Sequence, residues 1–209
     1  WGIKKKKSRN YGHTKGIDVV KNIIDEAILK KIKYLTLFTF STENWKRPKT
    51  EINFLFKLIE QYFVREIDNV VKNNIKINII GNIKSLPTNI NKLLIYSMKR
   101  TNNCKKILVN LAINYGSKNE IIDATNKVMQ KRKKISIKKI KENLYTGNLP
   151  DPDILIRTGG KKRLSNFLLW QLAYSELYFL DKLWPDFTIK DYKKVIDNYK
   201  KVKRNFGNI

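Results

Sequence analysis

The stretch Tyr34–Asn44, with the sequence YLTLFTFSTEN, decides the fold class. Its first seven residues show no clean apolar–polar alternation, which is typical of a strand covered on both faces, so we expect a central strand at Tyr34–Phe40. Segments with helical spacing flank it, at Gly16–Lys31 and from a predicted cap at Thr50 to about Lys72. A strand between two helices indicates an α/β fold with parallel strands.

The same alternation continues along the chain. Further strands are predicted at Ile75–Ile80, Lys106–Ile113, Asp153–Ile156 and Glu176–Leu180. Further helices are predicted near Thr88–Asn102, after a capping box of Ser117 and Glu120, at Ile137–Tyr145, and after a second box of Thr188 and Asp191. Without repeats or linkers, residues 1–209 are predicted to be one α/β domain, with a central, mostly parallel sheet flanked by helices.

Polar residues follow three of the predicted strands, at Ser41–Asn44, Asn114–Gly116 and Arg157–Gly160. Sites in open α/β sheets form just beyond the carboxyl ends of the strands, so we expect the chemistry there.

Composition excludes several classes of protein. No stretch of about 18 apolar residues exists, so no transmembrane helix is expected. One cysteine and one histidine argue against an internal disulfide, a cysteine-rich metal site and a histidine-based zinc site. No removable signal is visible, and the cysteine usage indicates a reducing, intracellular compartment.

The chain carries 44 Lys and Arg against 18 Asp and Glu, a formal net charge of +26. Such a charge is compatible with nucleic acid, anionic membranes or phosphorylated substrates as partners. Most aromatics lie in core-like segments rather than among the lysines, so no specific nucleic-acid partner is expected. The runs Lys4–Lys7 and Lys131–Lys134 are interpreted as solvated surface.

The few arginines are more informative, because guanidinium binds phosphate oxygens in a planar fork. Arg9, Arg47, Arg157 and Arg163 are all predicted beside strand ends or helix starts. An isolated arginine is more often a surface residue or a carboxylate's partner. Arg157 and Arg163, however, flank a Gly159–Gly160 turn whose N–H groups could reach an anion, and Ser165 with Asn166 is predicted to open a helix. This arrangement favours phosphate binding.

His13 and Glu176 each allow two interpretations. His13 precedes the first predicted helix beside Arg9, where a structural hydrogen bond and a diphosphate contact are about equally favoured. Glu176 begins an otherwise apolar strand and needs a cation, which is either a metal ion or a salt-bridge partner such as Arg163 or a lysine.

Six segments occur in a characteristic order: YGHTKG (Tyr11–Gly16), FSTENWKRP (Phe40–Pro48), NYG (Asn114–Gly116), ILIRTGG (Ile154–Gly160), RLSNFLLWQ (Arg163–Gln171) and AYSELYFLDKLWPDF (Ala173–Phe187). Together they resemble the cis-prenyltransferases, the undecaprenyl and dehydrodolichyl diphosphate synthases. The resemblance covers nearly the whole chain. It implies a Mg²⁺-assisted homodimer that adds isopentenyl diphosphate to an allylic diphosphate such as farnesyl diphosphate, with cis double bonds, to give a long polyprenyl diphosphate.

The resemblance also implies roles for individual residues. Arg9 and His13, with Trp1, match positions that bind the allylic diphosphate, and Arg157, Arg163 and Ser165 match those that bind isopentenyl diphosphate. Glu176 matches the carboxylate that holds Mg²⁺ and is counted as catalytic. The Glu43–Asn44–Trp45 loop with Arg47 matches a segment that closes near the allylic substrate, with Asn44 and Arg47 catalytic. A hydrophobic tunnel is expected between the sheet and the two long helices, lined by residues such as Leu55, Ile59 and Phe63.

One departure concerns the family's first motif, D-G-N-G-R-W, of which only Trp1 is present. The catalytic Asp would lie upstream, so the chain as written is expected to have impaired catalytic activity. Trimming at the N-terminus is favoured as the explanation over evolutionary loss of the catalytic residues. The alternatives are a non-catalytic partner subunit and, less favoured, a nucleic-acid-binding module. The ending Lys203–Gly207 lacks the R-x-G of two-subunit eukaryotic systems and favours a homodimer.

A lipid product and a basic surface allow a cytoplasmic location or peripheral contact with a membrane, including reticulum or plastid membranes.

Overall fold

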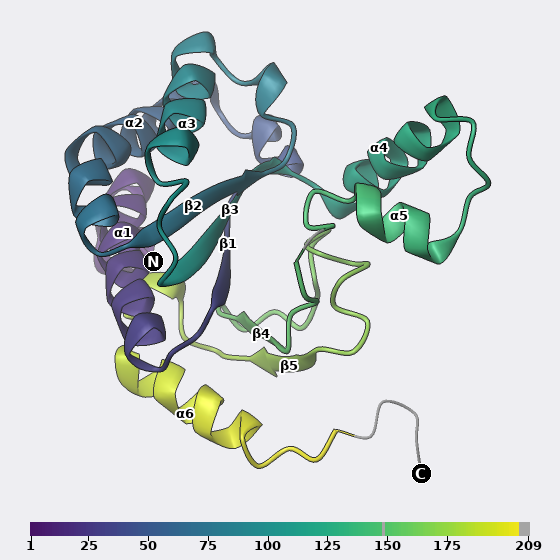
Figure 1. Cartoon of the computed structure of the whole chain (residues 1–209). Coiled ribbons are helices and arrows are strands. Elements are labelled where there is room, and N and C mark those ends of the chain that lie inside the picture. The colour runs from purple at the N-terminus through teal and green to yellow at the C-terminus, as the bar shows by residue number, and fades with distance from the viewer. Residues whose placement is uncertain (148, 205–209) are drawn as a thin grey trace. The chain divides into compact units, whose positions relative to one another are not determined.

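A computed structural model describes residues 1–147 and 149–204, so Asn205–Gly207 of the C-terminal comparison lie outside the described residues (Figure 1). The predicted α/β class with parallel strands is confirmed. By its internal contacts the chain divides into two compact units, residues 1–23 with 149–204 and residues 24–147. The single domain over residues 1–209 stays a prediction.

The unit of residues 24–147 contains a three-stranded parallel sheet in the order β1-β3-β2. Its strands are β1 (Tyr34–Ser41), β2 (Ile75–Ile80) and β3 (Ile107–Tyr115), and its helices are α2 (Lys49–Lys72), α3 (Thr88–Arg100), α4 (Ser117–Gln130) and α5 (Ile137–Asn143). α2 and α3 pack on each other and on β2, and α4 packs on α5. All the strands predicted for this segment are confirmed.

The prediction that Tyr34–Phe40 is a central strand is wrong for this sheet, because β3 is central and β1 lies at its edge. Side chains of β3 such as Val109 and Ile113 are fully buried, whereas Phe38 of β1 is 38% exposed. A polar ladder fixes the register of the three strands. Asn78 donates to Asn110 Oδ1 (2.8 Å), and Asn110 donates in turn to Thr36 Oγ1 (3.2 Å).

The unit of residues 1–23 and 149–204 contains the first part of α1 (Arg9–Leu29), the parallel pair β4 (Ile154–Arg157) and β5 (Glu176–Phe179), and α6 (Ile189–Tyr199). The Thr188–Asp191 capping box of α6 is confirmed, and Lys182 Nζ lies 2.8 Å from Asp191 Oδ2. No helix among residues 1–147 and 149–204 has the length and apolar content that crossing a membrane requires.

Three helix starts differ from the prediction. α1 begins at Arg9 rather than Gly16, so His13 lies inside the helix. α2 begins at Lys49 after Pro48, which leaves Thr50 within its first turn instead of at its cap. The predicted box of Ser117 and Glu120 does not cap α4, whose cap residue is Gly116. Glu120 is buried instead and accepts hydrogen bonds from the Tyr115 hydroxyl and the Tyr145 N–H.

The early start of α1 depends on a contact that the local sequence does not show. Two glycines, Gly12 and Gly16, lower the intrinsic helix propensity of this segment. Trp184, however, donates its indole N–H to the Gly16 carbonyl (2.9 Å) and lies against the helix there. A Cβ on Gly16 would lie 3.1 Å from Trp184 Cδ1, so the absent side chain is what admits the indole ring.

Gly16→Ala is therefore expected to lower the free energy of unfolding by about 1–3 kcal/mol, because Trp184 must shift. The matched control is Gly12→Ala in the same helix, whose Cβ would lie no closer than 3.5 Å to any neighbour. This control is expected to raise stability by about 0.5–1 kcal/mol, the usual gain in a helix. Urea unfolding measures both changes, and stabilisation by both substitutions would contradict the role given to Trp184.

Candidate functional site

Arg157, at the end of β4, is held in place by the chain that follows it. Its Nη1 donates to the carbonyl of Arg163 and to Ser165 Oγ (2.9 Å). Since both bonds use one nitrogen, the rest of the guanidinium fork has no partner among the described residues. The structure thus brings together Arg157, Arg163 and Ser165, which the sequence had grouped.

Two predicted anion contacts near this cluster are wrong. Gly159 and Gly160 have positive φ (94° and 68°) and turn towards the end of β5, where their N–H groups donate to the carbonyls of Lys182 (2.7 Å) and Leu180 (2.9 Å). These donors are already used. No helix opens at Ser165 and Asn166 either, because both have left-handed backbones that do not continue a helix. Of the groups predicted to bind an anion here, the guanidinium groups of Arg157 and Arg163 and the Ser165 hydroxyl remain.

No carboxylate within the described residues forms an ion pair with Arg157 or Arg163. Burial, with the positive charge of Arg163, lowers the pKa of the Arg157 guanidinium below its usual value. Two like charges held close together without a counter-ion repel each other. Binding an anion between or beside them removes that repulsion, so this cluster has the electrostatics of a phosphate site.

The other predicted residues of this unit lie at the N-terminus and on β5. Arg9 is the first residue of α1 and His13 follows one turn later, so both side chains extend from one face near the positive end of the helix dipole. Trp1 stacks on Tyr11 with ring centroids 5.8 Å apart. The Trp1 indole N–H is buried and has no hydrogen-bond partner in the described part of the chain.

Glu176 is the first residue of β5 and is partly buried. Neither Arg163 nor any lysine among residues 1–147 and 149–204 forms an ion pair with it, which removes the salt-bridge interpretation for the described chain. A carboxylate without a cation suits a hard metal ion such as Mg²⁺. The same residues contain no group of three or more His, Cys, Asp or Glu able to hold a metal by themselves. Glu176 could therefore supply one ligand of a shared site, not a complete cage.

In the other unit, the predicted loop forms the 3₁₀ helix Thr42–Lys46. Asn44 Oδ1 accepts a hydrogen bond from the Ser41 N–H (3.1 Å), which ties the loop, with Glu43, to the end of β1. Arg47 instead forms an ion pair with Glu51 (3.0 Å) in the first turn of α2. Its charge is thus already balanced, and a direct role in catalysis stays a prediction.

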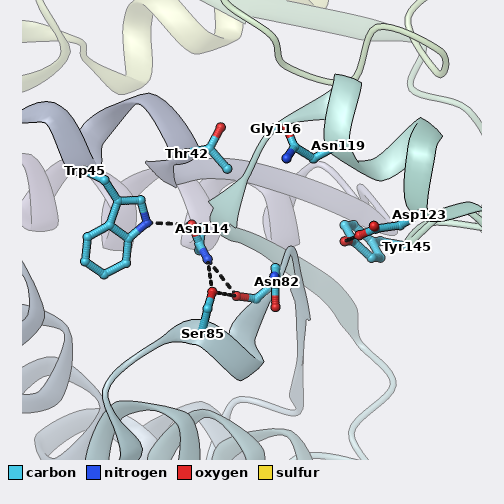
Figure 2. A pocket seen from close by; sticks show the side chains of 9 residues that line it. All are labelled: Thr42, Trp45, Asn82, Ser85, Asn114, Gly116, Asn119, Asp123 and Tyr145. Atoms are coloured by element: carbon cyan, nitrogen blue, oxygen red, sulfur yellow. Dashed lines mark hydrogen bonds between the residues drawn. The ribbon is translucent and has the colours of Figure 1, made fainter.

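Trp45 borders a cavity of about 450 Å³, whose lining includes Thr42, Asn114 and Gly116 from the polar clusters predicted at the strand ends (Figure 2). The lining comes from the segments that follow β1, β2 and β3 and from α4 and the chain after α5. Its residues are Thr42, Trp45, Asn82, Ser85, Asn114, Gly116, Asn119, Asp123 and Tyr145. Among the residues that the structure describes, no lysine or arginine lines this cavity. It is a polar compartment with one carboxylate, rather than a diphosphate cradle.

Asn114 connects the walls of this cavity, as Figure 2 shows. Its Oδ1 accepts the Trp45 indole N–H (2.7 Å), while its Nδ2 donates to the Asn82 carbonyl (2.7 Å) and to Ser85 Oγ (2.8 Å). The side chain is buried and its backbone is left-handed (φ 50°), a conformation that asparagine tolerates. Asn114 thereby fixes the position of Trp45.

The far wall is fixed by a second polar network. Tyr145 donates its hydroxyl to Asp123 Oδ2 (2.5 Å), and its backbone N–H donates to Glu120 Oε1 (2.9 Å). Burial, followed by the bond to Asp123, raises the pKa of the Tyr145 phenol. The phenol therefore stays protonated at neutral pH and remains a donor.

The family described as "Putative undecaprenyl diphosphate synthase" matches residues 1–207. The chain belongs to this family. Among curated relatives, the isoprenyl transferases of Oceanobacillus iheyensis and Clostridium perfringens are 39% and 41% identical over 100% of this chain and 86% and 85% of theirs. That of Rickettsia typhi is 42% identical over 99% of this chain and 92% of its own.

Solved structures of the family match the fold. A probable undecaprenyl diphosphate synthase from Campylobacter jejuni has a TM-score of 0.85 and 36% identity, over 93% of this chain and 92% of that one. Lavandulyl diphosphate synthase from Lavandula x intermedia, in complex with dimethylallyl diphosphate, has a TM-score of 0.94 and 31% identity, over 100% and 93%. The predicted family and fold class are thus confirmed.

Asn114 belongs to a polar cluster that the sequence predicted at a strand end, whereas Asn82, Ser85, Asn119, Asp123 and Tyr145 were not predicted. One signal was available. Gly81 follows β2 and has a φ of 127°, and a Cβ there would lie 2.1 Å from the Ile113 carbonyl oxygen. Gly81 and Asn82 directly follow a predicted strand, as the Arg157–Gly160 cluster does, and could have been included among the strand-end clusters on that ground.

Asn114→Gly keeps the left-handed backbone and removes all three side-chain hydrogen bonds. We expect the free energy of unfolding to fall by about 2–4 kcal/mol and the Trp45 indole N–H to exchange faster with solvent. The control is Asn74→Gly, also left-handed (φ 58°), which removes one exposed bond to the Lys105 N–H. Urea unfolding and hydrogen exchange measure both effects. Equal losses in the two variants would show that Asn114 does not hold Trp45.

Proposed function

We propose that the protein elongates a prenyl chain by adding isopentenyl diphosphate to an allylic diphosphate, the transfer reaction of its family. The observation that carries this proposal is the pair Arg157 and Arg163, two cations held together beside Ser165 without a carboxylate partner in the described chain. A substrate with a diphosphate group supplies the charge that this cluster lacks.

The reaction forms one carbon–carbon bond and breaks one carbon–oxygen bond. The allylic substrate loses diphosphate, its terminal carbon bonds to the alkene of isopentenyl diphosphate, and that unit loses a proton to give a new double bond. The family resemblance supports cis geometry, farnesyl diphosphate as a starter, and a long product. Since two polyanions react, two basic clusters are needed to hold them.

Arg157 and Arg163 with Ser165 are assigned to isopentenyl diphosphate. Arg9 and His13 are assigned to the allylic diphosphate, supported by their position at the start of α1, where the helix dipole favours an anion. Trp1 is assigned to the same substrate, because it matches a position of the family's first motif. Trp45, with Asn44 and Glu43, is assigned to arranging the allylic substrate, since the residue is 40% exposed while its indole N–H is fixed by Asn114.

Glu176 is the residue assigned to Mg²⁺, together with diphosphate oxygens. When bound, the ion stabilises the negative charge that develops on the departing diphosphate. The protein's own part is to keep a carboxylate partly buried and without a cation partner at the start of β5. The tunnel lined by Leu55, Ile59 and Phe63 and the homodimer remain part of this proposal, supported by the family resemblance.

The test is prenyl transfer by the protein extended with the family's D-G-N-G-R residues ahead of Trp1, using labelled isopentenyl diphosphate, farnesyl diphosphate and Mg²⁺. Arg157→Lys keeps the charge and loses the planar fork, so kcat/KM for isopentenyl diphosphate is expected to fall about a hundredfold. Glu176→Gln is expected to raise the Mg²⁺ concentration needed for half-maximal rate. The control Arg100→Lys alters an exposed pair with Asp68 and is expected to leave both quantities unchanged.

Two outcomes would contradict the proposal. If the extended protein forms no product alone but strongly stimulates prenyl transfer by an added catalytic subunit, the protein is a non-catalytic partner subunit instead. Equal rates for Arg157→Lys and Arg100→Lys would remove Arg157 from the site.

A further inference from the structure

The hairpin of α4 and α5 ends in a strongly basic segment, residues 127–141, which we call the basic tip. Its sequence is KVMQKRKKISIKKIK, with eight Lys or Arg side chains and no Asp or Glu. It therefore contributes eight of the chain's 26 net positive charges. Between the end of α4 at Gln130 and the start of α5 at Ile137, the chain runs through residues that are all exposed.

Apolar side chains are exposed within the same tip. Met129 is 59%, Ile135 48% and Ile137 76% exposed, whereas Val128 beside them is fully buried. α4 thus has its own buried stripe, and the exposed side chains do not serve the packing of the hairpin. Exposed aliphatic side chains among lysines are typical of segments that lie on a membrane surface, where lysines meet headgroups and aliphatics enter below them.

Four of the eight cations of the basic tip have no carboxylate partner in the described chain. Arg132, Lys133, Lys134 and Lys138 form no ion pair with any residue of the described chain. The nearest carboxylate along α4, Asp123, is already bonded to Tyr145. A run of lysines on its own indicates solvated surface, but uncompensated charge combined with exposed isoleucines indicates a partner that is both anionic and apolar.

We propose that the basic tip docks the protein on an anionic lipid surface, with Ile135 and Ile137 entering the headgroup region. Lipid fits better than nucleic acid for two reasons. The tip contains no aromatic side chain on which a base could stack. Seven of its eight cations are lysines, which act as point charges on a diffuse anionic surface rather than as forks for single phosphates.

The hairpin also reaches the cavity described above. Asn119 and Asp123 of α4 line that cavity, and Lys131 follows Asn119 by twelve residues, or about 18 Å along a helix. Docking through the tip would hold the cavity of this unit close to a lipid surface. The docking itself does not depend on the proposed reaction, although a polyprenyl product would make it useful.

The test is sedimentation of the protein with vesicles of phosphatidylcholine alone or mixed with phosphatidylglycerol, at low and high salt. We expect binding to the anionic vesicles only, weakened by salt. The variant K133Q/K134Q/K138Q/K139Q is expected to lose affinity about a hundredfold. The variant I135N/I137N keeps every charge and is expected to lose about tenfold.

The matched control is K33Q/K72Q/K105Q/K106Q, which removes the same charge at the opposite, amino-terminal edge of the three-stranded sheet. These four lysines are all exposed. The control is expected to keep vesicle affinity within about threefold. Equal losses in the control and the tip variant would mean that net charge alone binds vesicles and would overturn the proposal. So would duplex DNA binding through the tip without vesicle binding. Circular dichroism confirms that each variant is folded, and vesicle binding needs no prenyl transfer.

Discussion

One side chain, Asn114, ties together the carboxyl ends of three parallel strands. It stands at the end of β3, accepts the indole N–H of Trp45 beyond β1, and donates to Asn82 and Ser85 beyond β2. Parallel strands bring their loops to one edge of the sheet, and without such a bond those loops would be independent. The cavity beside Trp45 exists because these loops are bonded to one another.

The unit of residues 1–23 and 149–204 differs in how its polar side chains are paired. The side-chain amide of Asn114 is bonded to Trp45, Asn82 and Ser85. Arg157 and Arg163, in contrast, form no ion pair with a carboxylate of the described chain. The backbone groups that might have served an anion there, the N–H groups of Gly159 and Gly160, are used to close the turn onto β5. A fold that satisfies its backbone but leaves two guanidinium groups uncompensated keeps them available for a ligand.

The sequence predicted the strands well because each is a short apolar run bounded by polar residues. It predicted the Thr188–Asp191 box because that cap is local. It failed where a partner lies far along the chain. Glu120 has the spacing of a capping residue, but Tyr145, 25 residues later, recruits it into a buried network. Phosphate binding by Arg157 and Arg163 was predicted from the two arginines around the Gly159–Gly160 turn. The finer roles, isopentenyl diphosphate for these arginines and Mg²⁺ for Glu176, came from the family resemblance, and no periodicity could have supplied them.

The assignment of Arg157 and Arg163 to a diphosphate site can be tested by calorimetric titration of the protein with inorganic diphosphate, which needs neither turnover nor a second substrate. We expect binding that Arg163→Gln weakens about tenfold or more and that Arg100→Gln, with the same loss of charge at an exposed pair, leaves unchanged. Equal affinity for diphosphate in both variants would show that the positive surface as a whole binds the anion, and would contradict the claim.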